Sequence, residues 1–367
     1  MCQEVKQADS AYIAGTYGRF DAVMLKGEGA HYEGTDGKHY IDFGTGIGVT
    51  LFGACDPDWV AAVTHQLTTL GHTSNLYYTE PQTQLAKLLC ERTGMKKVFF
   101  GNSGAEANEC ALKVARKYGE KDNRDVIVTL VNSFHGRTIA TLAATGQDRF
   151  HEHFGPFPAG FRYTPANDIP ALEAILSTGK VCGLLMEMVQ GEGGVIPLDP
   201  AFVKKAEELC HANDILLMVD EVQTGNGRTG TLYAYEQFGI HPDVVTTAKG
   251  LAGGLPMGAC LLGERCEHVL GKGDHGSTFG GNPICAAAAL NAEIADQFGA
   301  LVQEQKNMMA SRVSLTCISV TWTSYWNDSL LCLVVRAEMD GDTSMTETYS
   351  YDFFGGKRLM SEDLLAR

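Results

Sequence analysis

The stretch LLMVDEVQTG, residues 216–225, places two carboxylates directly after a run of apolar residues. The run from Leu216 to Val219 is typical of a strand buried on both faces, and Asp220 and Glu221 follow where that strand should leave the core. Two adjacent buried carboxylates are costly unless positively charged groups lie beside them. Taken alone, Asp220 is equally compatible with a turn cap, so its meaning depends on what else the fold brings to this position.

Strand-like and helix-like segments alternate on both sides of this stretch, between about residues 58 and 290. The other strand candidates are KVFFG, RDVIVTLV, VCGLLMEMVQ and DVVTTA, and the helical segments include AEANECALKVARKYG and AFVKKAEELCHAND. This alternation predicts an α/β fold with a mostly parallel central sheet and helices on both faces. In such a sheet the ligand crevice lies beyond the carboxyl ends of the strands, so a site is expected where the polar residues follow the strands.

Composition narrows the classes of function. The chain has 367 residues and a formal net charge of −15, which argues against a nucleic-acid partner. Its 11 cysteines include no C-x-x-C pair, so we expect neither a disulfide framework nor a metal site, and a reducing, cytoplasmic compartment. The N-terminus shows no secretion or transit signal, and no apolar stretch is long enough to span a membrane.

Lys249 directly follows the strand candidate DVVTTA. A lysine at the exit of a buried strand is partly desolvated, which lowers the pKa of its amine and makes that amine a better nucleophile. A Schiff base with a carbonyl cofactor is one use of such an amine, and a snorkelling surface lysine is the alternative. Beside Lys249, Asp220 could pair with the protonated ring nitrogen of pyridoxal phosphate (PLP), which needs a carboxylate there to act as an electron sink.

Three further segments carry polar or aromatic residues suited to such a cofactor. Ser103 can cap the helix that follows it, and a helix N-terminus suits a phosphate, although a helix packed on a sheet would look the same. The segment NSFHGRT supplies Phe134, which could stack on a ring, and Arg137, which could grip a carboxylate. The segment HGSTFGGNP supplies Ser277 and Thr278 ahead of a helix expected to begin at Asn282-Pro283.

These segments occur in a fixed order that resembles a known family. The motifs SGAEANECALK, FHGRT, MVQGEGG, DEVQTGNGRTG, TTAKGLAGGLPMGA and HGSTFGGNP resemble those of class III, ornithine-type aminotransferases of PLP fold type I. The resemblance runs from about Tyr12 to about Asp296. It implies a PLP enzyme that transfers the distal amine of N2-acetylornithine to 2-oxoglutarate, with ornithine, succinylornithine or 4-aminobutyrate as alternative donors.

The resemblance also implies roles for single residues. Lys249 would bind the cofactor covalently and act as general base, and Asp220 would hold the pyridine nitrogen. Arg137 would bind the α-carboxylate of the donor, with Ser277 beside it and Glu192 near the substrate side. The residues implied to contact the cofactor are Gly104, Ala105, Phe134, Asp220, Glu221, Val222, Gln223, Lys249 and Thr278. In this family that threonine comes from the other subunit, so a homodimer is implied. From its position, Glu221 could instead turn aside to pair with an arginine.

Three segments are expected along the chain. Residues 1–50 should contain a small β-meander with turns at Glu33-Gly34 and Asp36-Gly37. Residues 51–297 should form the large PLP-binding domain. Residues 298–367 lack the βα rhythm and the motifs of the family's C-terminal domain. A frameshift or a divergent domain would explain this, and a damaged chain could bind PLP but turn over poorly.

Overall fold

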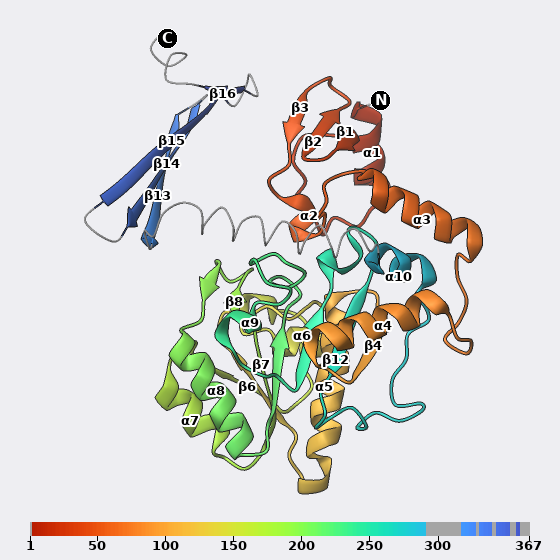
Figure 1. Cartoon of the computed structure of the whole chain (residues 1–367), viewed down its shortest axis with the longest axis vertical. Coiled ribbons are helices and arrows are strands. Elements are labelled where there is room, and N and C mark those ends of the chain that lie inside the picture. The colour runs from red at the N-terminus through yellow and green to blue at the C-terminus, as the bar shows by residue number, and fades with distance from the viewer. Residues whose placement is uncertain (1, 291–316, 328–329, 340–342, 353–356, 360–367) are drawn as a thin grey trace. The chain divides into compact units, whose positions relative to one another are not determined.

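The computed structural model of the chain describes residues 2–290 and the backbone of 317–327, 330–339, 343–352 and 357–359. The chain divides into two compact units (Figure 1). The large unit comprises Gly44–Phe52 and Asp56–Phe298, and the small unit comprises Met1–Phe43, Gly53–Cys55 and Gly299–Arg367. The end of the predicted large domain, residues 291–297, lies outside the described residues.

The large unit is built on a seven-stranded sheet. Its strands are β4 (Lys97–Gly101), β5 (Val126–Leu130), β6 (Phe161–Thr164), β7 (Val181–Met186), β10 (Leu216–Asp220), β11 (Val244–Thr247) and β12 (Gly258–Leu262). They lie in the order β4-β12-β11-β10-β7-β5-β6. Strand β12 alone runs opposite to the other strands of this sheet, so the predicted mostly parallel sheet is confirmed.

Helices and short turns precede, connect and follow these strands. The helices are α2 (Thr45–Gly48), α3 (Pro57–Thr69), α4 (Glu80–Thr93), α5 (Gly104–Gly119), α6 (Ile139–Ala144), α7 (Ile169–Leu176), α8 (Pro200–Ala212), α9 (Tyr235–Phe238) and α10 (Pro283–Leu290). The 3-10 turns are η1 (Glu120–Asp122), η2 (Asp148–Phe150) and η3 (Lys249–Ala252), and β8 (Val189–Gln190) pairs with β9 (Ile196–Pro197). Among the described residues, no helix is long and apolar enough to cross a membrane.

The core lies on both faces of the sheet. In β10, Leu217 and Val219 belong to one hydrophobic cluster, whereas Leu216 and Met218 belong to another. Because successive side chains of a strand point to opposite faces, the two clusters lie on opposite sides. The first also takes in residues of α4, α7, α8 and α10, and the second residues of α5 and α6. Helices therefore cover both faces, as predicted (Figure 1).

Helix α5 shows how the sequence positions the edge of the sheet. Ser103 caps it, because its hydroxyl accepts a hydrogen bond from the backbone amide of Glu106 at 3.2 Å. Five residues of its inner face are fully buried: Ala107, Cys110, Ala111, Val114 and Ala115. Tyr118, on the same face, is only partly buried, and its hydroxyl donates to Asp214. The helix start is thus fixed at the end of β4.

The small unit contains helix α1 (Cys2–Tyr12) and the predicted N-terminal meander. Strands β1 (Met24–Glu28), β2 (His31–Gly34) and β3 (His39–Ile41) pair antiparallel in sequence order. Glu33 and Gly34 lie within β2 rather than in a turn, so that turn prediction was wrong. The turn at Asp36-Gly37 is present, where the Asp36 carboxylate accepts the backbone amide of Lys38.

The C-terminal part of the small unit contains four strands. They are β13 (Cys317–Asn327), β14 (Leu330–Met339), β15 (Thr343–Asp352) and β16 (Lys357–Leu359). All neighbouring pairs are antiparallel and follow chain order. The loss of βα alternation predicted for residues 298–367 is therefore a change to antiparallel structure in the described strands.

Candidate active site

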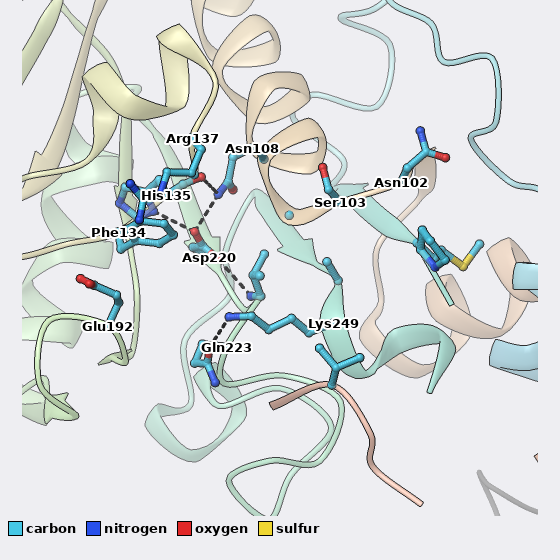
Figure 2. A pocket seen from close by; sticks show the side chains of 18 of the residues that line it. Asn102, Ser103, Asn108, Phe134, His135, Arg137, Glu192, Asp220, Gln223 and Lys249 are labelled. Carbon is cyan, nitrogen blue, oxygen red and sulfur yellow. Dashed lines mark hydrogen bonds and ion pairs between the residues drawn. The ribbon is translucent and has the colours of Figure 1, made fainter. Parts of the chain in front are cut away.

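A cavity of about 410 Å³ lies in the large unit beyond the carboxyl ends of five strands. The cavity is lined by residues at or just after the ends of β4, β5, β7, β10 and β11. This is the position expected for a ligand crevice in such a sheet. Lys249 and Asp220 both line it, together with Phe134, Arg137 and Gln223 (Figure 2). The strands thus bring together residues that are more than a hundred positions apart in the chain.

Lys249 occupies a strained backbone position at the exit of β11. Its φ angle is 49°, in the left-handed region that residues other than glycine rarely adopt. The Asn226 side-chain amide holds the preceding backbone, because it donates to Thr247 Oγ1 at 2.9 Å and to the Ala248 carbonyl at 3.0 Å. Strained conformations of this kind concentrate at functional sites.

The Lys249 side chain is partly buried and donates a hydrogen bond to Gln223 Oε1 (Figure 2). Burial lowers the pKa of the Lys249 amine, although the negative charges of Asp220 and Glu187 oppose that shift. A lowered pKa increases the fraction of neutral amine, which is the nucleophilic and basic form.

The Asp220 carboxylate is buried and accepts three hydrogen bonds. Oδ2 accepts from Asn108 Nδ2 and His135 Nδ1, both at 2.8 Å, and Oδ1 accepts from the backbone amide of Val222 at 3.0 Å. Because a carboxylate can only accept, Nδ1 of His135 carries its proton. The last of these bonds is the turn cap considered from the sequence, and it exists beside the contacts that face the cavity.

Glu187 is a second carboxyl group in the cavity wall. It follows β7, is 4% exposed, and accepts a hydrogen bond from the backbone amide of Phe134 at 3.3 Å. Burial raises the pKa of Glu187 well above its usual range, and the negative charge of Asp220 adds to the shift.

Phe134 and Arg137 form an aromatic and cationic wall after β5. The Arg137 guanidinium carbon lies 5.5 Å from the Phe134 ring centroid and 4.4 Å from that of Phe150. The two rings meet edge to face with centroids 5.6 Å apart. Over the described part of the chain, no carboxylate forms an ion pair with Arg137, so its charge is available to an anionic ligand.

The N-terminus of α5 forms another part of the wall. Gly104 and Ala105 are its first residues, and the first amides of a helix have no intrahelical acceptor and carry partial positive charge. A Cβ on Gly104 would lie 2.7 Å from Val222 Cγ1. Only glycine therefore lets the helix start approach the loop after β10 this closely, and the result is a site suited to a phosphate.

Glu192 lines the same cavity but is exposed. Its carboxylate pairs with Arg149 at 2.7 Å and accepts a hydrogen bond from Gln147 Nε2 at 2.6 Å. Both partners come from the segment before and within η2. The charge of Glu192 is thus already compensated within the chain.

Glu221 lies outside the residues that line the cavity, which differs from the prediction that it contacts the cofactor. It is fully buried, and its carboxylate accepts hydrogen bonds from the Thr224 hydroxyl and from the backbone amide of Tyr235. These partners also take the place of the arginine that we considered. Glu221 points away from the cavity because successive side chains along an extended backbone point in opposite directions, and Asp220 points into the cavity.

Ser277 and Thr278 line a separate surface hollow with Asn75 and Leu76. Ser277 remains linked to the cavity, because its Oγ accepts a hydrogen bond at 3.1 Å from Asn102 Nδ2 and Asn102 lines the cavity. Thr278 is exposed. Within one chain the structure therefore does not bring Thr278 to Lys249.

Asn108, His135 and Glu187 were given no role from the residue pattern. A buried polar residue on the inner face of α5 was the available signal for Asn108, but its partner Asp220 is 112 positions away. His135 was visible only as part of the segment FHGRT. His135 and Glu187 reach Asp220 because they follow neighbouring strands, and Asn108 reaches it because α5 packs on the sheet.

Known proteins share this architecture and these motifs. The family model of class-III aminotransferases matches residues 12–313. An acetylornithine aminotransferase of Haemophilus ducreyi is 56% identical over 289 residues, which cover 78% of this chain and 74% of that protein. An N-acetylornithine aminotransferase structure from Stenotrophomonas maltophilia K279a has a TM-score of 0.64 and 34% identity, covering 89% of this chain and 82% of that chain.

A structure of the ornithine aminotransferase from Toxoplasma gondii, with PLP at partial occupancy in its active site, is also similar. Its TM-score is 0.79 at 30% identity, covering 91% of this chain and 82% of that chain. PLP is the cofactor of class-III aminotransferases, and the cavity described above fits it. A lysine of lowered pKa, a buried carboxylate, an aromatic ring and a helix N-terminus all converge there.

The family match ends at residue 313, so most of the segment predicted to depart from the family lies outside it, and that prediction is confirmed. The match nevertheless contains the whole seven-stranded sheet and every residue that lines the cavity. From residue 12 to residue 313, the chain belongs to the class-III aminotransferase family.

Proposed function

We propose that the chain transfers the distal amine of N2-acetylornithine to 2-oxoglutarate, giving N-acetylglutamate 5-semialdehyde and glutamate in arginine biosynthesis. The observation that carries this proposal is one cavity lined by Lys249 and Asp220, in a chain 56% identical to an acetylornithine aminotransferase. When bound, PLP supplies a carbonyl for the substrate amine and a ring that stores the electron pair released from carbon.

Lys249 attaches the cofactor and then moves the proton. Its Nζ, whose pKa is lowered by burial, accepts a proton from the substrate carbon that bears the reacting amine. The hydrogen bond with Gln223 keeps Nζ inside the cavity between these two tasks. General base catalysis of this kind contributes roughly 10²–10⁴-fold to a rate.

The other cofactor contacts follow from position in the wall. Asp220 holds the pyridine nitrogen, Phe134 stacks on the ring, and the amides of Gly104 and Ala105 bind the phosphate. Val222 and Gln223 line the cavity beside Asp220. The burial of Asp220 strengthens its charge interaction with the pyridine nitrogen, because a buried charge is screened less than one in water.

Arg137 and Glu192 face the substrate. Arg137 binds the α-carboxylate of the donor through its planar fork, and the Phe134 and Phe150 rings hold the guanidinium in place. Glu192 contacts the substrate from the rim while paired with Arg149. Ser277 lies beside this region through its bond with Asn102.

We further infer a homodimer in the cytoplasm, in which Thr278 of the partner subunit reaches the phosphate. The loop that bears Thr278 is accompanied by exposed apolar side chains, with Leu76, Tyr78 and Phe279 being 89%, 100% and 59% exposed. Apolar patches of this kind mark interaction surfaces. The nine cysteines of the described residues are all free, in keeping with a reducing compartment.

The test is a half-reaction of the PLP-loaded chain with each donor, without 2-oxoglutarate. N2-acetylornithine should bleach the visible cofactor band faster than ornithine, succinylornithine or 4-aminobutyrate does. Lys249→Ala should show no such band shift. Faster bleaching by another donor would reassign the substrate. A stable band with every donor would instead favour a chain that binds PLP but turns over poorly, as an altered C-terminal segment would produce.

A further inference from the structure

A buried hydrogen-bond relay runs from β11 to Asp220 through Asn108, in the N-terminal half of α5. Asn108 is 1% exposed, and its Nδ2 donates to Asp220 Oδ2 and to the His135 carbonyl, both at 2.8 Å. Its Oδ1 accepts from the Thr246 hydroxyl at 2.7 Å. Every polar atom of the Asn108 side chain is therefore engaged, and Figure 2 shows its bond with Asp220.

The partners leave one orientation for this amide. The His135 carbonyl and the Asp220 carboxylate can only accept, so both must receive hydrogens from Nδ2. The Thr246 hydroxyl then donates to Oδ1 on the other side. Rotation of the amide would break all three bonds of a buried side chain, and an unsatisfied buried polar group is costly.

Thr246 anchors the far end of the relay to the same strand ends. It is fully buried and lies opposite Asp220 in the parallel register of β10 and β11. Its carbonyl also accepts the backbone amide of Glu221 at 2.8 Å. The relay thus begins and ends on two paired residues of adjacent strands, and α5 supplies the link between them.

The arrangement leaves one acceptor position of Asp220 for a ligand. Oδ2 already accepts two hydrogen bonds, from Asn108 and His135, whereas Oδ1 accepts only one, from Val222. We propose that Asn108, oriented by Thr246, is a positioning residue that fixes the Asp220 rotamer so that Oδ1 is presented to the ring nitrogen of PLP. This inference rests on the role proposed for Asp220.

A structural role for Asn108 predicts something different. If Asn108 only satisfied buried groups, its loss would weaken the fold and would affect all cofactor analogues alike. A positioning role acts on the ring nitrogen alone. It should therefore change the preference of the protein between PLP and the analogue in which CH replaces that nitrogen.

The experiment measures the dissociation constants of PLP and of this deaza analogue with the cofactor-free full chain by equilibrium dialysis. The preference for PLP should fall about tenfold in Asn108→Ala and about threefold in Thr246→Val, since each removes hydrogen bonds that orient the carboxylate. Thr129→Val is the matched control, because Thr129 is a fully buried threonine of β5 whose hydroxyl has no hydrogen-bond partner among the described residues. It should keep the wild-type preference.

The Asp220→Asn variant distinguishes the role proposed for Asp220 from the positioning role proposed for Asn108. If Asp220→Asn leaves the preference for PLP unchanged, the role proposed for Asp220 fails. If Asp220→Asn abolishes the preference but Asn108→Ala and Thr246→Val keep it, the positioning role is overturned. Circular dichroism reports folding of each variant, and Thr246→Val, which keeps the shape of the side chain, decides the matter should Asn108→Ala not fold.

Discussion

Glu221→Gln should flatten the pH dependence of stability of the cofactor-free chain. Glu221 is fully buried and accepts hydrogen bonds from Thr224 and from the backbone amide of Tyr235. Burial raises the pKa of Glu221 from 4.5 to about 7; its hydrogen bonds oppose this shift, and the charge of Asp220 adds to it. Glutamine resembles the neutral form of this side chain at every pH.

The size of the effect follows from proton linkage. Between pH 4.5 and about 7 the folded chain keeps a proton on Glu221 that the unfolded chain releases. The native state then binds more protons, so this contribution to stability is complete below pH 4.5 and is lost as the pH rises. One proton corresponds to about 1.4 kcal/mol per pH unit, which gives about 3 kcal/mol over the interval.

Urea unfolding of the wild type and of Glu221→Gln at about pH 5 and about pH 8 measures this contribution to stability. The free energy of unfolding of Glu221→Gln minus that of the wild type should rise by about 2.5 kcal/mol between the two conditions, because part of the change occurs below pH 5. Glu208→Gln, at an exposed site of α8, should follow the wild type. A difference for Glu221→Gln that is the same at both pH values would refute the argument that burial neutralises this carboxyl. PLP affinity of Glu221→Gln should stay within about twofold of wild type, because the carboxylate does not line the cavity.

Three shorter predictions concern the cavity wall. Arg137→Lys keeps the charge but loses the planar fork, so KM for the amino donor should rise about tenfold or more with a smaller change in kcat; an unchanged KM would remove Arg137 from substrate binding. In the cofactor-free chain, burial lowers the pKa of Lys249, so an amine-acylating reagent at about pH 8 should modify it ahead of the exposed lysines in peptide mapping, and equal rates would contradict this. Gly104→Ala places a Cβ 2.7 Å from Val222 Cγ1 and should weaken PLP binding by about 1–3 kcal/mol, with Val222→Ala in the same chain restoring it; no rescue would exclude the steric explanation.

Much of the sheet could be predicted because its central strands carry a distinct signal. The stretch from Leu216 to Asp220 is buried throughout, and a continuous apolar run is typical of such a strand. Strand β6 gave no such run, because it lies at the sheet edge with two of its four residues exposed. Strand β12 was also missed: it follows a segment rich in glycine and proline and runs against its neighbours.

The site was predictable where a residue type directly follows a strand. Lys249 and Asp220 met that condition, and the structure places both in one cavity. The pattern could not say which of two adjacent carboxylates faces the cavity, because that depends on where β10 ends relative to the loop. Nor could it pair Asn108 with Thr246 and Asp220, since those contacts depend on how α5 packs across the sheet.

Borohydride reduction of the PLP-loaded chain, followed by peptide mapping, tests most directly whether Lys249 and Asp220 serve one cofactor. Reduction makes the attachment of the cofactor to its lysine permanent. We predict that the label lies on Lys249 in the wild type and that Asp220→Asn lowers the yield of labelled peptide at limiting PLP. A label on another lysine, or a yield that does not depend on Asp220, would contradict the account.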